Sequence, residues 1–140
     1  MDFRTKLFRY KHIYDMPGTD ELFFEAVREN VKWHCEACTA YHEILSTQGF
    51  SPQMLETYAD LAQLPPIPTL YLKQHPMRSV PAQKLHFKST TSGTSGKPVE
   101  VGFDAGALFL GYQMLQKMLR YHKLLSTRPT NYLILGYEPN

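Results

Sequence analysis

The segment Thr91–Pro98, with the sequence Thr-Ser-Gly-Thr-Ser-Gly-Lys-Pro, constrains the chain more than any other feature. Its first six residues offer four hydroxyls, two glycines and no apolar side chain, which indicates a loop and not part of a core. Glycine permits positive φ and close approach of a ligand, and free N–H groups with hydroxyls can surround an anion. Because Lys97 adds a positive charge at the end of the loop, the expected ligand is a phosphate group.

Other motifs that carry phosphates or nucleophiles do not fit this spacing. A Walker A loop needs four residues between its glycines, whereas two separate Gly93 from Gly96, and Pro98 replaces the magnesium-binding hydroxyl. A dinucleotide fingerprint needs G-x-G-x-x-G, which the chain lacks. A nucleophile elbow needs glycine at position 97, which is lysine. Many Ser/Thr/Gly-rich hairpin loops bind nothing, and the residues alone leave that alternative open.

The residues on both sides of the loop alternate with a period of two. Leu85 and Phe87 alternate with polar residues before the loop, and Val99, Val101 and Phe103 do so after it. This pattern predicts two half-buried strands, paired as a hairpin that holds the loop at its tip.

A helix and a further strand are expected after the hairpin. Asp104 is a good N-cap for a helix that reaches about Leu125. Its apolar residues cover so wide an angle that we expect burial on more than one side, with Met114 and Met118 filling the core. The apolar run at 131–136 predicts a buried strand.

The first half of the chain has helical periodicity. We expect a short helix before a turn at Pro17-Gly18, and then a long helix capped by Thr19 or Asp20 and ending near Thr47. Apolar residues at spacings of three and four give this long helix one continuous buried face: Phe24, Val27, Val31, Cys35, Cys38, Tyr41 and Leu45.

Short elements are expected between the long helix and the hairpin. Ser51-Pro52 predicts an N-cap and first helical residue of a short helix through about Ala62. The prolines of 64–68 then force an extended path, residues 69–73 fit either a strand or a single helical turn, and 74–83 form a connecting loop. We therefore expect an α/β (α+β) chain with a mainly helical segment at 1–83 and a β-loop-β-α-β segment at 84–140.

The pair Cys35-x-x-Cys38, with His34 and His42 nearby, invites a zinc interpretation. Structural zinc sites usually need a second ligand pair, and the chain has only two cysteines. We therefore expect thiols buried in the core and no metal held by the protein. His86 and His122 are the histidines nearest the loop elements, but imidazoles at such positions are seldom general bases, and no catalytic residue is assigned.

Composition limits the partners and the compartment. The 140 residues are 43% apolar, enough for one domain, and 15 basic against 13 acidic residues leave a scattered net charge of +2. Such a balance argues against nucleic acid and a membrane surface as partners. Residues 1–16 lack the apolar run of a signal peptide. We therefore expect a cytoplasmic protein with reduced cysteines.

The loop resembles the phosphate-binding signature of the adenylate-forming enzymes, Ser/Thr-Ser-Gly-Thr-Thr/Ser-Gly-x-Pro, at every position of Thr91–Pro98. The order of elements is similar to the amino-terminal part of the phenylacetate–CoA ligase branch, and most similar to the acyl-protein synthetases of bacterial luciferase systems. Loose matches lie upstream, at 41–45, at Gly49-Phe50 and at 61–73 with its Ile67-Pro68-Thr69.

The resemblance implies an acid–thiol ligase that uses ATP and Mg²⁺. A carboxylic acid, fatty or aryl, would become an acyl-adenylate and pass to a thiol acceptor, for which an acyl-protein or reductase subunit is a candidate. By the resemblance, the ATP phosphates would be held by Thr91, Ser92, Gly93, Thr94, Ser95, Gly96 and Lys97. The later motifs of the family have no counterpart before Asn140, so the chain is expected to be the amino-terminal segment of such an enzyme.

Two alternatives to an enzyme segment remain open from the sequence. One is a phosphate- or nucleotide-binding module, derived from such an enzyme, that has lost catalysis. The other is a helical interaction partner that pairs through its apolar surface, including with a second copy of itself.

Overall fold

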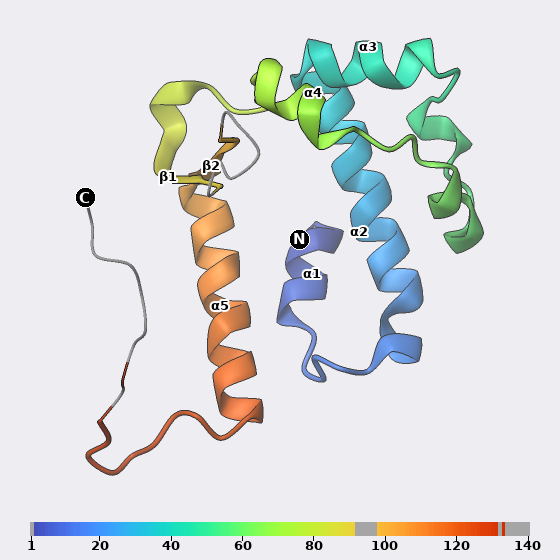
Figure 1. The fold of residues 1–140 in the computed structure, drawn as a ribbon. Helices are drawn as coiled ribbons and strands as arrows, with labels where there is room; N and C mark the ends of the chain where they lie inside the picture. The colour runs from blue at the N-terminus through green and yellow to red at the C-terminus, as the bar shows by residue number, and fades with distance from the viewer. Residues whose placement is uncertain (1, 92–97, 132, 134–140) are drawn as a thin grey trace.

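The computed structural model describes residues 2–91, 98–131 and 133, and within these ranges it is a mixed α/β chain with one two-stranded antiparallel sheet (Figure 1). None of the helices in these ranges combines the length and hydropathy needed to cross a bilayer. The α-helices and strands are α1 (Phe3–Arg9), α2 (Met16–Ala37), α3 (Thr39–Thr47), α4 (Thr69–Gln74), β1 (Leu85–Thr90), β2 (Glu100–Asp104) and α5 (Ala105–Tyr121), and the 3₁₀ helices are η1 (Pro52–Met54), η2 (Tyr58–Gln63) and η3 (Ala82–Lys84).

The helix α2 begins earlier than predicted. Asp15 is its N-cap and its carboxylate accepts a hydrogen bond from the N–H of Gly18 at 3.1 Å. The predicted turn at Pro17-Gly18 and the predicted cap at Thr19 or Asp20 are therefore wrong. Proline is tolerated in a first helical turn because the N–H it lacks has no intrahelical partner there.

The predicted long helix is two helices, because the chain leaves helical geometry at Cys38 with φ −134° and ψ 101°. Helical hydrogen bonding continues on both sides of this break: the Cys38 N–H donates to the His34 carbonyl at 2.9 Å, and the Cys38 carbonyl accepts from the His42 N–H at 3.0 Å. A bend that costs so few hydrogen bonds leaves the apolar spacing almost unchanged, so the sequence pattern did not reveal it.

The core lies where α2, α3 and the 3₁₀ segments meet, and it confirms the predicted buried face. Val27 and Tyr41 are partly buried against it, and Cys38 is buried at the end of α2. Both cysteines are free thiols, as expected of core cysteines. The buried cluster consists of Phe24, Val31, Cys35, Leu45, Phe50 and Leu55.

The connection from α3 to the hairpin differs in detail from the prediction. Ser51 precedes a 3₁₀ helix with Pro52 at its first position, as expected, but a second 3₁₀ helix at Tyr58–Gln63 replaces the rest of the predicted short helix. The segment that fitted either a strand or a helical turn is the helix α4.

The hairpin forms in the predicted place, with Thr90 opposite Glu100 and Lys88 opposite Gly102. Its strands are mostly exposed and not half-buried as predicted: Phe87 keeps 53% of its surface exposed. Phe87 and Phe103 pack on each other across the strands, with ring centroids 6.0 Å apart, which shields part of this face but does not bury it.

The helix α5 begins as predicted, since the Asp104 carboxylate accepts from the Ala107 N–H at 2.7 Å. The expected burial on several sides is wrong. Leu110 is its one buried residue, Met114 is partly buried, and Met118 is exposed and not core filler. In Figure 1, α1 lies between α2 and α5, so α5 meets the helical half along one side only.

The predicted strand at 131–136 lies largely outside the described residues. Asn131 and Leu133 are described, have no regular secondary structure, and Leu133 is 88% exposed.

Candidate functional site

The predicted phosphate loop begins at Thr91, where the hairpin closes. The Thr91 N–H donates to the Val99 carbonyl at 3.0 Å, and the Val99 N–H donates to the Thr91 Oγ1 at 2.9 Å. The other predicted phosphate-binding residues, Ser92, Gly93, Thr94, Ser95, Gly96 and Lys97, lie outside the described residues. Their role stays a prediction.

Three charged side chains meet beside the closed end of the hairpin. Glu100 Oε1 lies 2.6 Å from the Arg78 guanidinium and 3.4 Å from Lys88 Nζ. Glu100 is opposite Thr90, directly before the loop. Ion pairs this exposed contribute at most about 1 kcal/mol to stability, but two cations and one carboxylate leave a positive charge next to the loop.

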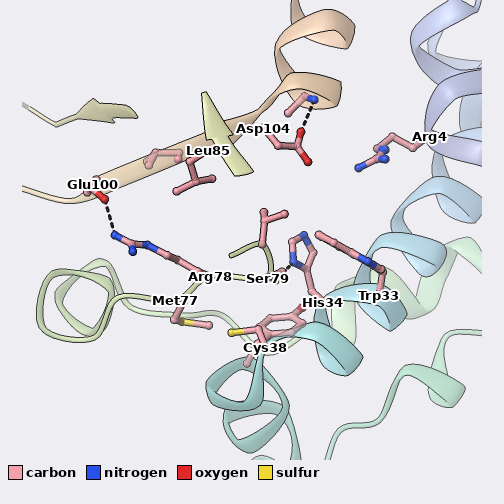
Figure 2. Close-up of a pocket in the computed structure, with 15 residues that line it drawn as sticks. Arg4, Trp33, His34, Cys38, Met77, Arg78, Ser79, Leu85, Glu100 and Asp104 are labelled. Carbon is pink, nitrogen blue, oxygen red and sulfur yellow. Dashed lines mark hydrogen bonds and ion pairs between the residues drawn. The ribbon is translucent and has the colours of Figure 1, made fainter. Parts of the chain in front are cut away.

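A cleft of about 470 Å³ lies between the helical half and the hairpin (Figure 2). Elements distant in sequence meet here: Arg4 comes from α1, His34 from α2, and Ser79 from the segment before the hairpin. Glu100 and Asp104 line the other side from β2. The cleft has the size of ordinary small-molecule sites.

His34 projects into this cleft and is half-buried. Its Nδ1 shares a hydrogen bond of 2.5 Å with the Ser79 hydroxyl, and its ring meets the Trp33 indole edge-on at a centroid distance of 4.6 Å. Burial lowers the pKa of His34 from its ordinary value, and the charge of Arg4 lowers it further. The imidazole is therefore held neutral at neutral pH.

The lowered pKa of His34 predicts acid sensitivity. The unfolded chain binds a proton at His34 near the ordinary pKa of 6.5, whereas the folded chain binds it only at lower pH. Stability should therefore fall as pH drops through 6.5 toward the lowered pKa, and His34 should contribute no pH dependence above 6.5.

Urea unfolding at about pH 7.5 and about pH 5.5 measures this loss. We expect His34→Asn to lose less stability between the two pH values than the wild type. The loss in Arg4→Gln should be intermediate between those of the wild type and His34→Asn. Arg28→Gln, which removes an exposed cation paired with Glu25 on α2, should behave as the wild type. Equal losses in the wild type and His34→Asn would contradict the burial of a neutral imidazole.

Arg4 and Asp104 carry opposite charges on opposite sides of the cleft. Figure 2 shows the Arg4 side chain extending from α1 toward Asp104 at the start of α5. No ion pair within 4.0 Å joins them in the described part of the chain, and the cap hydrogen bond uses only Asp104 Oδ1. The cleft thus presents a cation and a carboxylate that are not in contact.

Of the other histidines and cysteines singled out in the sequence, Cys38 lines this cleft, whereas Cys35, His42, His86 and His122 do not. His86 is exposed, with its Nδ1 3.0 Å from the Lys84 carbonyl, and His122 contacts the Tyr14 hydroxyl at the far end of α5. Across the described ranges, no group of three or more His, Cys, Asp and Glu side chains could hold a metal ion.

Sequence reasoning missed Arg4, Trp33 and the cleft-facing role of Asp104, because no motif links them. One signal was available in the sequence, since Trp33 is the single tryptophan of the chain; in the structure it keeps 39% of its surface exposed.

Comparisons with protein-family models, with curated proteins and with solved structures found no match for this chain.

Proposed function

We propose that the chain is the amino-terminal segment of an ATP-dependent acyl-adenylating ligase, which activates a carboxylic acid as acyl-AMP for transfer to a thiol. The observation that carries the proposal is the phosphate-binding signature of Thr91–Pro98, placed between two strands that pair in antiparallel register. Successive backbone N–H groups of a glycine-containing loop can form a concave site for a phosphate.

The residues around the loop have the chemistry that this reaction needs. The carboxylate attacks the α-phosphate and pyrophosphate leaves, so its charge must be held and neutralised. The Thr91 Oγ1 accepts from the Val99 N–H, which leaves its own proton free to donate to a phosphate oxygen. Hydroxyls and N–H groups of Ser92–Gly96 would add donors, and Lys97 would add charge. Mg²⁺ would neutralise the remaining phosphate charge.

Acid-dependent exchange of pyrophosphate into ATP, measured in the full native protein with a panel of fatty and aryl acids, tests the proposal. Lys97→Ala and Ser92→Ala should each lower the exchange rate about tenfold or more, the effect of losing one charge-assisted hydrogen bond. The matched control is Lys32→Ala, which removes an exposed lysine of α2 and should leave exchange unchanged. Unchanged exchange in both loop variants would refute the proposal.

A phosphate-binding module without catalysis is the alternative, and the same loop supports it. Such a module would be stabilised by pyrophosphate or ATP, by about 2.7 kcal/mol at a hundred times the dissociation constant, and would catalyse no exchange. Thermal unfolding with and without pyrophosphate separates the cases. If pyrophosphate stabilises the wild type but not Lys97→Ala, and no exchange is detected, the non-catalytic module is favoured. If pyrophosphate does not stabilise the wild type, the result counts against both the ligase and the module.

A further inference from the structure

The cleft between α1, α2 and the start of α5 has a polarity that the phosphate-loop proposal does not use. Near the loop, Arg78 and Lys88 both pair with Glu100, which leaves one net positive charge there. Arg4 and Asp104 face the same cleft from opposite sides and form no ion pair with each other within the described chain. A ligand that carries one negative and one positive charge would form an ion pair with Arg4 and another with Asp104.

We propose that this cleft binds a free amino acid with an apolar side chain. Its carboxylate lies against the Arg4 guanidinium, and its ammonium group lies against the Asp104 carboxylate. Its side chain packs against Trp33 and the apolar residues Val80 and Leu85, which line the same cleft. The site does not rest on the proposed ligase function.

Charge complementarity selects the zwitterion over simpler ligands. A monocarboxylate would be attracted by Arg4 but repelled by the nearby Asp104 carboxylate. A simple amine would be attracted by Asp104 but repelled by Arg4. Only a ligand that carries both a positive and a negative charge is attracted by both groups. The volume of about 470 Å³ exceeds that of such a ligand, so the site has room for an apolar side chain.

The side chains permit clean substitutions. Asp104 is also the N-cap of α5, and asparagine caps helices about as well as aspartate. Asp104→Asn therefore removes the charge and keeps the cap. Arg4 is exposed on α1, so Arg4→Gln should preserve the fold.

Trp33 supplies the signal for the test. As the single tryptophan of the chain, and one that lines the cleft, its fluorescence reports directly on occupancy. The probes are leucine, 4-methylpentanoate, which lacks the amine, and 3-methylbutylamine, which lacks the carboxylate. None of them absorbs where tryptophan is excited.

We expect leucine to change the Trp33 emission saturably, and to bind about tenfold or more tightly than either analogue. Arg4→Gln should lower leucine affinity toward that of the amine, and Asp104→Asn toward that of the acid. Arg28→Gln, an exposed arginine of α2 outside the cleft, should bind leucine as the wild type does.

Three results would overturn the proposal. The first is the absence of a saturable response to leucine in protein whose circular dichroism shows it to be folded. The second is equal binding of leucine and its two analogues. The third is a direct Arg4–Asp104 ion pair, seen as a coupling energy between Arg4→Gln and Asp104→Asn in ligand-free unfolding, because a closed pair would occupy the charges that the ligand needs.

Discussion

Replacing Leu45 with alanine is expected to destabilise the chain by about 2–5 kcal/mol. Leu45 is 1% exposed and belongs to the buried cluster where α2, α3 and the 3₁₀ segments meet. The substitution removes buried apolar atoms and leaves a cavity in the cluster that also holds Phe24 of α2 and Phe50, which follows α3. Urea unfolding followed by far-ultraviolet circular dichroism measures the loss.

Two matched variants make the Leu45 result specific. Leu70→Ala removes the same atoms from a side chain of α4 that is 65% exposed, and should change stability by less than about 0.5 kcal/mol. Leu45→Met nearly conserves volume and should cost less than about 1.5 kcal/mol. Equal effects of Leu45→Ala and Leu70→Ala would show that the core lies elsewhere. If Leu45→Ala does not fold at all, the Met variant still gives a measurable change.

The sequence predicted the features that depend on neighbouring residues. The buried face of the first long helical region follows from residues three and four apart, and Phe24, Val31, Cys35 and Leu45 lie in the core as expected. The N-cap of α5 at Asp104 and the pairing of β1 with β2 also depend on residues close together in the sequence. Each is decided within one turn or one strand pair, so spacing alone is sufficient.

The sequence failed where the outcome depends on what covers an element. The apolar residues of α5 predict burial on several sides, yet Leu108, Tyr112 and Leu115 are exposed because α5 meets the helical half through one side. The predicted half-burial of the hairpin strands is wrong for the same reason, as the exposed Phe87 shows. Periodicity identifies an apolar face but does not say whether another element packs on it.

The two candidate sites differ in the same way in how far the sequence could predict them. The proposed phosphate loop is eight consecutive residues, so its motif can be found in the sequence, although Ser92–Lys97 lie outside the described residues. The cleft brings together Arg4, His34 and Asp104, which are separated by 30 and by 70 positions. Their proximity depends on how α1 and α2 pack against the hairpin and α5, and no spacing rule contains that information.

Lys117 of α5 contacts the end of α1. Its ammonium group donates to the Tyr10 carbonyl at 2.7 Å and also to the Phe8 carbonyl. Both carbonyls belong to the end of α1, where helix carbonyls lack intrahelical partners and a positive charge is favourable. Burial lowers the pKa of Lys117, and the two hydrogen bonds compensate for the desolvation. Lys117 therefore connects the helical half of the chain with α5.

Replacing Lys117 with methionine should destabilise the chain by about 2 kcal/mol, the contribution expected of hydrogen bonds from a charged donor. Hydrogen exchange should rise most in α1. Because α1 carries Arg4, leucine binding in the cleft should weaken in the same variant. Lys32→Met, at an exposed position of α2, should leave stability within about 0.5 kcal/mol of the wild type, and Lys117→Arg should retain part of the contact. If Lys117→Met matches Lys32→Met in stability and in the exchange of α1, the contact does not hold α1 against α5.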